Sequence, residues 1–315
     1  MEDIQCIFCK KCSEQIAIQE NGYQGKKCSS CGLIFISPRP AFNEIINRYT
    51  QRNDNILAQS LTSLEFGKRL YAKHNLSIIC RFIKKGYLLE IGAGAGFFLD
   101  EARKKGFDSS GIEINRSKAN FIRSKLGIPC EDHPLGNSSY EGKIFDVIYH
   151  CDVISHFYDP ISEFQKINNK LNKNGLVVFE TGNVGDVKEK YYKLFDKFQY
   201  PDHLFFFSEK NLKELLRLTG FELIKIYRYS ILLELLIVKI LKNIFTFIKF
   251  ENSYRGKNIT NQVVSSGDIT TPNVFFKKVK TIYSCFNYFN RYGIGNILPK
   301  KGRPQTIIVI AKKTR

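Results

Sequence analysis

A glycine-rich loop constrains the fold of this chain more than any other feature of its sequence. The loop reads Leu88-Leu89-Glu90-Ile91-Gly92-Ala93-Gly94-Ala95-Gly96-Phe97, an apolar strand that runs through three glycines into a helix. Glycine lets a backbone approach a ligand closely, and a helix N-terminus presents free N–H groups and the positive end of a dipole. The spacing is GxGxG, whereas dinucleotide-binding loops have GxGxxG. Glu90 also suits a cationic ligand better than a pyrophosphate.

Downstream of this loop, apolar strand-like runs alternate with helical periodicity, which is typical of an α/β sheet with crossover helices. The predicted strands are Tyr87–Ile91, Ser110–Ile114, Phe145–Cys151, Gly175–Thr181, Phe221–Tyr229 and Thr306–Lys312. The predicted helices are Phe97–Lys105, Arg116–Leu126, Pro160–Leu171 and Glu209–Thr219. Upstream, residues 41–85 show helical periodicity that includes Ile45, Ile46 and Tyr49. With 43% apolar and 25% charged residues in 315, the chain is neither wholly disordered nor fibrous.

Five of the nine cysteines lie close to the N-terminus, at positions Cys6, Cys9, Cys12, Cys28 and Cys31. Two CxxC turns can aim four thiolates at one zinc ion, and the spacing of the pairs Cys6–Cys9 and Cys28–Cys31 suits a zinc ribbon. Cys9 and Cys12 form a rival first pair, and spacing alone cannot choose between the two. We favour Cys6, Cys9, Cys28 and Cys31 as ligands of a structural zinc, because a 40-residue module lacks a core of its own. Unpaired structural cysteines are the alternative.

The N-terminus is acidic and has no apolar run, so the sequence shows no secretory signal. We therefore expect a cytoplasmic protein in a reducing compartment, where clustered cysteines bind metal more often than they form disulfides.

The glycine loop and the motifs after it resemble the class I S-adenosylmethionine-dependent methyltransferases. The closer resemblance is to a bacterial branch that acts on small molecules and cell-surface sugars and carries an N-terminal zinc ribbon. Glu90–Gly96 resembles the E/DxGxGxG loop, and Gly111-Ile112-Glu113-Ile114 resembles the end of the second strand. Further motifs follow in the family's order, at Phe145–Ile148, Asp152–Pro160, Leu171–Gly175 (with one glycine missing), Pro201–Ser208 and Gly220-Phe221.

This resemblance implies a doubly wound, seven-stranded, Rossmann-like methyltransferase sheet, with a zinc ribbon before it and a helical insertion before the last strand. It implies S-adenosylmethionine as cofactor, held by Glu90, Gly92, Ala93, Gly94, Gly96, Glu113, Asp132 and Asp152. Physical reasoning supports Glu113, since an acid at the carboxyl edge of the second strand lies beside the ligand crevice and can accept two bonds from a ribose diol. Asp132 would meet the adenine, although the segment Cys130–His133 departs from the family's pattern.

Methyl transfer requires alignment of acceptor, methyl group and sulfur, together with a base where the acceptor must lose a proton. The candidate bases are His156, which follows the fourth strand, and His203, in the aromatic segment 200–207 that could form a lid or pocket wall. A structural, hydrogen-bonding role is the alternative for both. The segment His150-Cys151-Asp152-Val153 is unlike NPPY, which disfavours methylation of exocyclic base amines.

The net charge of +18 is concentrated in residues 226–315, which hold 16 basic and 3 acidic side chains. Within this region residues 231–250 form an amphipathic pattern whose charged residues leave no uncharged run of about 20 residues, as a membrane span needs. This helix would cover the core or a dimer partner, or lie on an anionic membrane. Basic and aromatic residues at 275–280 and 283–292 would grip phosphates of a nucleotide sugar, lipid-linked glycan or nucleic acid, or form a solvated face.

We therefore expect four units: a zinc ribbon (1–40), a helical linker or lid (41–85), the cofactor-binding domain (86–230 and 305–315) and a basic helical insertion (231–304). The predicted function is methyl transfer to a small or glycan-type acceptor, such as a nucleotide sugar or surface polysaccharide. An RNA methyltransferase that grips RNA with the ribbon and insertion is one alternative, and a non-catalytic binding module is another. Contact with the inner face of the membrane through 231–250 is compatible with a cytoplasmic location, and the sequence leaves the oligomeric state open.

Overall fold

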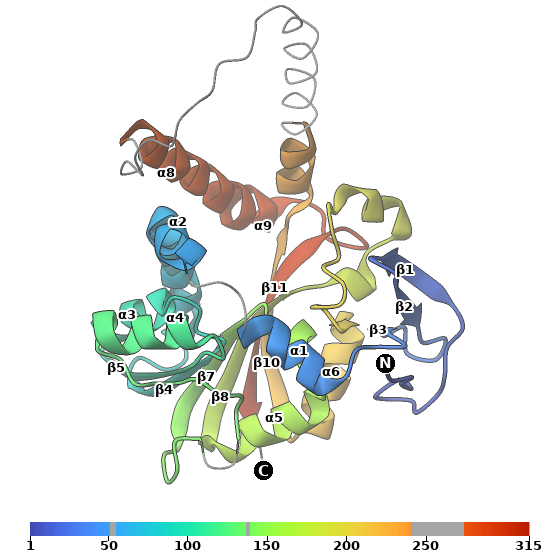
Figure 1. Cartoon of the computed structure of the whole chain (residues 1–315), viewed down its shortest axis with the longest axis horizontal. Coiled ribbons are helices and arrows are strands. Elements are labelled where there is room, and N and C mark those ends of the chain that lie inside the picture. Colours follow the sequence, from blue (N-terminus) through green and yellow to red (C-terminus); the bar gives the residue numbers. More distant parts are fainter. Residues whose placement is uncertain (51–54, 137–138, 241–273, 315) are drawn as a thin grey trace, which may run out of the picture.

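The computed structural model describes residues 1–50, 55–136, 139–240 and 274–314, and a seven-stranded sheet lies at its centre (Figure 1). Along the sheet the strand order is β10–β11–β8–β7–β4–β5–β6. The strands are β4 (Gly86–Ile91), β5 (Phe107–Ile112), β6 (Cys130–Glu131), β7 (Phe145–Cys151), β8 (Leu171–Gly182), β10 (Phe221–Ser230) and β11 (Gln305–Lys313). Neighbours from β6 to β8 are parallel, whereas β11 is antiparallel to both of its neighbours. The order reverses beside β4, which opens a ligand crevice at the carboxyl ends of the strands and confirms the predicted fold class.

Two strands begin earlier than the sequence pattern predicted. β5 starts at Phe107 and not at Ser110, and β8 starts at Leu171 and not at Gly175. In both strands the early residues are mostly polar, so the hydrophobic pattern becomes visible only where the strand enters the core. The helix predicted at 116–126 is α4 (Arg116–Phe121) followed by a π-helical turn η1 (Ile122–Leu126), which ends at Gly127 with φ 62°.

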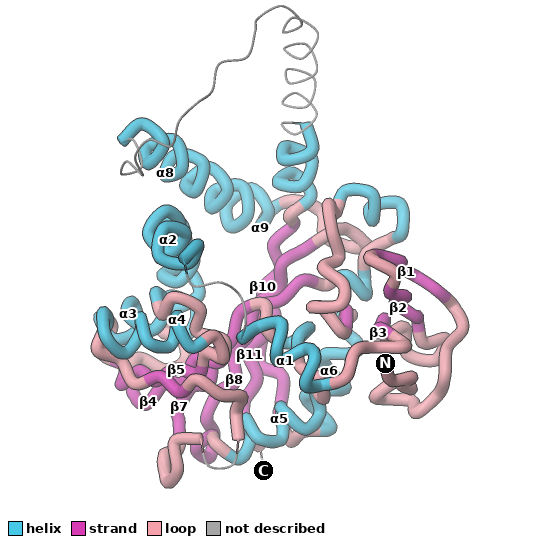
Figure 2. The backbone as a smooth tube through the Cα atoms, in the orientation of Figure 1, coloured by secondary structure: helices cyan, strands magenta, loops and turns pink. Residues whose placement is uncertain are grey.

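Helices cover both faces of the sheet (Figure 2). On one face, α2 (Asn55–Ile79) contacts both α3 (Phe97–Lys104) and α8 (Val274–Tyr288), while α5 (Pro160–Asn169) and α6 (Glu209–Leu218) pack together on the other. Leu88 belongs to the first face's core, and its neighbour Leu89 belongs to the second. Parallel strands buried on both faces read as continuous apolar runs, which is why the sequence revealed them.

A second, four-stranded sheet joins the N-terminal module to the rest of the chain. Its strands are β1 (Ile16–Glu20), β2 (Tyr23–Lys27), β3 (Ile34–Ile36) and β9 (Phe205–Phe206), in that order. β9 comes from the segment expected as a lid or pocket wall, and it pairs antiparallel with β3. The buried residues of β3 and β9 belong to the same hydrophobic core as α5 and α6. The ribbon therefore shares a core with the larger sheet.

The linker and the insertion are helical where the structure describes them. The linker contains α1 (Phe42–Thr50) and α2, and the insertion contains helical residues 232–240, α8, η5 (Phe289–Ile294) and α9 (Gly295–Ile297). Three further short helices are η2 (Ile154–His156), η3 (Val184–Asp186) and η4 (Glu189–Leu194). Among the described residues, no helix is long and apolar enough to cross a membrane. Of the predicted amphipathic helix, residues 241–250 lie outside the described part of the chain, and the four-unit division and the membrane contact remain predictions.

His150 is a polar side chain buried in the core between apolar rings. It is fully buried in β7, and its ring stacks on Phe179 at a centroid distance of 5.0 Å. Within the described part of the chain, neither ring nitrogen has a hydrogen-bond partner. Burial lowers the pKa of His150 to about 3. Below the unfolded pKa of about 6.5 the unfolded chain binds a proton there that the folded chain does not, so stability falls as the pH falls towards 3.

We expect His150→Leu to raise the free energy of unfolding by about 1–2 kcal/mol at pH 7, because two unpaired buried nitrogens are removed. Between pH 7 and pH 5 the free energy of unfolding of the variant should also fall by about 2 kcal/mol less than that of the parent, because the unfolded variant has no imidazole at this position to bind a proton. Denaturant unfolding at both pH values measures each effect, and the exposed His133→Asn serves as the matched control. An unchanged pH slope in His150→Leu contradicts the prediction.

Candidate active site and metal centre

The glycine loop follows β4 at the carboxyl edge of the sheet, beside the point where the strand order reverses. Gly92, Gly94 and Gly96 have φ values of 72°, 57° and 73°, in the left-handed region that favours glycine. A Cβ at Gly92 would lie 2.6 Å from Val153 Cγ2, and one at Gly96 would lie 2.7 Å from Ile122 Cγ1. A Cβ at Gly94 meets no atom within 4 Å among the described residues. Gly92 and Gly96 thus permit close packing, while Gly94 faces open space where a ligand can lie.

Glu113 connects this loop to the end of β5. Its side chain is buried, with Oε2 accepting a hydrogen bond from Gly94 N at 2.7 Å and Oε1 accepting one from Asn115 N at 2.9 Å. Each carboxylate oxygen has a second lone pair that can accept a ligand hydroxyl. The position and donor set fit the ribose diol of the cofactor implied by the sequence.

Glu90 is buried beneath the loop and carries an unsatisfied acceptor. Only 6% of its surface is exposed, and within the described residues its Oε2 has no hydrogen-bond partner. Burial, and then the nearby charge of Glu113, raise the pKa of Glu90 well above its usual value. A buried polar atom without a partner is the kind of group that a ligand satisfies. A cationic ligand would supply both a donor and a compensating charge, so the residues present fit S-adenosylmethionine.

The other predicted cofactor-binding residues are Ala93, Asp132 and Asp152. Ala93 is buried within the loop, and its backbone N donates to Ile112 O at 3.0 Å. Asp132 follows β6 and pairs with two arginines, at 3.3 Å from Arg123 and 3.6 Å from Arg116. Asp152 follows β7, is exposed, and has φ 53°. All three lie at the carboxyl edge of the sheet, and their roles towards a cofactor remain predictions.

The two candidate histidines lie side by side. The ring centroids of His156 in η2 and His203 before β9 are 4.6 Å apart. His156 Nδ1 lies 2.7 Å from Tyr49 Oη and 2.9 Å from the carbonyl oxygen of Asp202. Burial, and then the neighbouring His156, lower the pKa of His203 to about 3, against a bond with the Phe198 backbone that raises it. His203 is therefore neutral near pH 7.

Tyr49 is a functional candidate that the sequence patterns missed. It lies near the end of α1, where its spacing from Ile45 and Ile46 suggested only an apolar helix face. The structure places its hydroxyl against His156, and its backbone carbonyl accepts a bond from Asn115 Nδ2 at 3.4 Å. Asn115 also donates to Glu113, so α1 joins the base candidate to the ribose-side acid. Tyr49 and His156 are 107 positions apart, and no local signal connects them.

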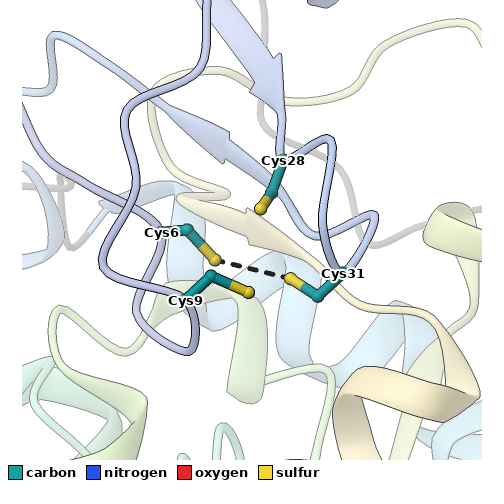
Figure 3. A group of neighbouring side chains, drawn as sticks. All are labelled: Cys6, Cys9, Cys28 and Cys31. Atoms are coloured by element: carbon teal, nitrogen blue, oxygen red, sulfur yellow. Dashed lines mark hydrogen bonds between the residues drawn. The ribbon is translucent and has the colours of Figure 1, made fainter.

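The four predicted metal ligands converge in the N-terminal module (Figure 3). The Sγ atoms of Cys6, Cys9, Cys28 and Cys31 all lie within 4.8 Å of one another, and those of Cys6 and Cys31 are 3.4 Å apart. Thiolates around a tetrahedral zinc are about 3.8 Å apart, from a Zn–S distance of about 2.3 Å. Cys12 is exposed and is not part of this group. The donor set and spacing thus fit a closed structural zinc site.

The second CxxC turn, Cys28–Cys31, is held by backbone hydrogen bonds and is bonded to α6. Gly32, with φ 76°, closes the turn by donating to Cys28 O at 2.8 Å. Burial raises the pKa of Cys28, but backbone donors of Cys31 and Ser30 outweigh it and bring the value to about 7. Burial raises the pKa of Cys6 and Cys31, so a bound metal would have to displace their thiol protons. Asn211 Nδ2 in α6 donates to the Cys31 carbonyl at 3.1 Å, so the metal centre is anchored to the larger domain.

Comparisons with known proteins agree with this geometry. A family model described as a methyltransferase domain matches residues 64–226. A tRNA U34 carboxymethyltransferase from Helicobacter hepaticus is 28% identical over 110 residues, which cover 30% of this chain and 34% of that protein. The chain thus matches about a third of the length of this curated relative.

Solved structures show the same fold at low identity. A phosphoethanolamine N-methyltransferase 2 from Haemonchus contortus superposes with a TM-score of 0.50 at 16% identity, covering 90% of this chain and 63% of that chain. A coclaurine N-methyltransferase superposes with a TM-score of 0.46 at 13% identity, covering 87% and 89%. At 16% identity the likeness to the Haemonchus contortus enzyme concerns the fold alone.

Proposed function

The chain belongs to the methyltransferase domain family and is an S-adenosylmethionine-dependent methyltransferase, and from this premise we propose that it methylates a small or glycan-type acceptor. A nucleotide sugar or a surface polysaccharide is the acceptor class that the N-terminal ribbon suggests through its resemblance. The observation that carries the proposal is the 2.7 Å contact between Tyr49 and His156. Such a pair supplies the base that a sugar hydroxyl needs when it attacks a methyl group.

When bound, S-adenosylmethionine supplies a methyl group on a positively charged sulfur. Glu113, which the backbone N of Gly94 holds in place, would bind the ribose end, and the carboxyl group of Glu90 would compensate the positive charge. We assign the Nδ1–H tautomer to His156, because the Asp202 carbonyl oxygen at 2.9 Å can only accept a hydrogen bond. The Tyr49 hydroxyl donates to the same carbonyl at 3.3 Å. In this tautomer Nε2 carries the lone pair, so His156 can take the proton of an acceptor hydroxyl. Neutral His203 forms the wall beside it.

We expect His156→Gln to lower kcat about 100-fold or more, the usual contribution of a general base, while the affinity for S-adenosylhomocysteine is unchanged. Tyr49→Phe should lower kcat about tenfold, because the ring of His156 loses a contact that orients it. Steady-state kinetics together with calorimetry separate the two readouts, and exposed His133→Gln is the matched control. Full kcat in His156→Gln would assign this histidine a structural role.

A transfer screen tests the function itself. The protein is incubated with methyl-labelled S-adenosylmethionine and separate sets of nucleotide sugars, glycans and RNA, and Gly94→Asp serves as the inactive control. Label on a nucleotide sugar or glycan supports the proposal. Label that appears on RNA alone contradicts it and supports the second candidate function.

That second candidate, RNA methylation, has its own supporting observation. The relative from Helicobacter hepaticus is named as a tRNA carboxymethyltransferase, and it matches 110 residues of the chain at 28% identity. An RNA substrate held by the basic insertion would show tight binding with a steep dependence on salt concentration. A carbohydrate acceptor would show no such steep dependence.

We also propose that the four N-terminal cysteines hold one structural zinc ion. The closeness of the four sulfur atoms supports this assignment. A site with four thiolate ligands leaves no open coordination position, so the metal would stabilise the ribbon and take no part in methyl transfer.

A further inference from the structure

A large groove lies apart from the glycine loop, between the zinc ribbon, α6 and the loop that precedes β11. Its volume is about 1140 Å³, and no residue of the glycine loop lines it. The ribbon contributes Phe8 and two residues of the CxxC turns, Cys9 and Cys31, while α6 contributes the residues along one of its faces. Residues 300–302 and Lys188 also line it, and Lys188 N donates to Gly302 O at 3.1 Å. The bond from Asn211 to the Cys31 carbonyl joins two of these walls, so the groove is built into the fold.

The groove carries a surplus of positive charge. Seven basic and three acidic side chains line it. The acids are already engaged: Glu209 pairs with Lys213 at 2.8 Å and with Arg228 at 2.7 Å, and Glu214 pairs with Arg217 at 2.7 Å. The third acid, Asp186, accepts a bond from the backbone N of Glu209 at 2.8 Å.

Four of the lining lysines form no ion pair with a carboxylate among the described residues. One of them, Lys300, donates to the backbone carbonyls of Asn296 and Leu298. The other three are Lys188, Lys210 and Lys301. All three are exposed, and they come from different elements of the lining, with Lys210 on α6 and Lys301 on the loop before β11. A ligand in the groove would therefore meet cationic groups from more than one element.

An unsatisfied acceptor lies among the buried residues of the lining. Gln305 is 6% exposed and lines the groove, and within the described residues its Oε1 has no hydrogen-bond partner. Its orientation is set because Nε2 donates to the carbonyl of Lys300 at 2.7 Å. A ligand hydroxyl is a suitable donor for this oxygen.

We propose that this groove is a second ligand site that binds a phosphate-bearing carbohydrate. Lysines from α6 and from the loop before β11 suit phosphate groups, and the amide oxygen of Gln305 suits a sugar hydroxyl. Among the described residues Phe8 is the single aromatic residue in the lining, whereas single-stranded nucleic acids bind on several stacking platforms. The volume exceeds the range of about 300–1,000 Å³ that is typical of small-ligand pockets, so the site has room for several sugar units.

The carbohydrate assignment rests on the proposed acceptor class, but binding in the groove requires neither the cofactor nor methyl transfer. The site would hold the phosphorylated part of an extended acceptor while another part reaches the crevice.

Calorimetric titration of the zinc-loaded full chain with UDP-glucose tests the site. We expect saturable binding that Lys210→Ala/Lys301→Ala weakens about tenfold, as expected for the loss of two partly exposed charge contacts. Lys173→Ala is the matched control, because this exposed lysine lies near the start of β8, away from the groove, and it should leave the affinity unchanged. Both variants should bind S-adenosylhomocysteine as the parent does.

Absence of UDP-glucose binding, or equal binding by the parent and the double variant, would overturn the proposal. Tighter and more salt-dependent binding of a 12-nucleotide RNA, lost in the same double variant, would overturn the carbohydrate assignment in favour of RNA. If the parent binds UDP-glucose but does not bind S-adenosylhomocysteine, the proposed function is contradicted and the groove site is still supported.

Discussion

Replacing Gly94 by aspartate is expected to lower the affinity for S-adenosylhomocysteine more than 100-fold. Gly94 faces open space in the crevice, so the new side chain would occupy the room left for the ligand. Its carboxylate would also lie beside Glu113, whose Oε2 accepts the Gly94 N–H at 2.7 Å, and the two negative charges would repel each other. A φ of 57° adds about 1–2 kcal/mol of strain for a residue with a Cβ. Calorimetry measures the affinity directly.

Two further variants divide this effect into its causes. Gly94→Ala carries the backbone strain without the charge, and we expect it to weaken binding by less than about tenfold. Glu113→Ala removes the acid on the ribose side and should weaken binding about 100-fold, as expected for the loss of charge-assisted hydrogen bonds worth about 1.5–3 kcal/mol each. Ordinary affinity in Gly94→Asp contradicts the position assigned to the ligand. An absence of binding by the parent protein contradicts cofactor-dependent methyl transfer altogether.

Removal of zinc is expected to destabilise far more than the 40-residue ribbon. β3 of the ribbon pairs with β9, and buried residues of both strands belong to the core that α5 and α6 share. Loss of the metal would therefore release the segment that carries His203. We expect Cys28→Ser to lower the melting temperature by about 10 °C, because a loss of about 3–5 kcal/mol shifts a domain of this size by about 2–4 °C per kcal/mol.

Cys12→Ser is the matched control, since Cys12 belongs to the same module but lies outside the four-sulfur group. It should retain about one zinc per chain by metal analysis and melt at the temperature of the parent. A Cys28→Ser protein that melts normally, or a folded parent protein without zinc, would contradict the structural role of the metal. Kinetic analysis of the zinc-depleted protein should show a fall in kcat that parallels the loss of folded structure.

Much of the site could be predicted because its signals are local. The GxGxG loop, Glu90 and Glu113 lie within 24 consecutive residues, in one strand–loop–helix–strand unit whose conformation the sequence pattern makes plain. The two CxxC turns are local as well, and each glycine or cysteine has a chemical reason for its position. The rival pair Cys9–Cys12 could not be rejected in this way, because spacing indicates which CxxC turns can form but not which four sulfur atoms lie close together.

Other features depend on contacts between distant segments. β9 consists of two residues that read as part of an aromatic loop, and only their pairing with β3 makes them a strand. The groove lies between α6, the ribbon and residues 300–302, three regions that are far apart in the sequence. Side-chain identity gives no information about such proximity.

The sequence by itself determined which groups are available for the proposed chemistry: a strand and glycine loop that would hold the cofactor, an acid that would bind the ribose and a set of cysteines that would bind a metal. These properties follow from backbone preferences and ligand types that act over a few residues. Only the tertiary structure decided which groups lie together: Tyr49 contacts His156, and the ribbon contacts β9 and α6. The physical reason is that contacts between distant segments depend on the burial of apolar surface and on edge-strand pairing over the whole chain.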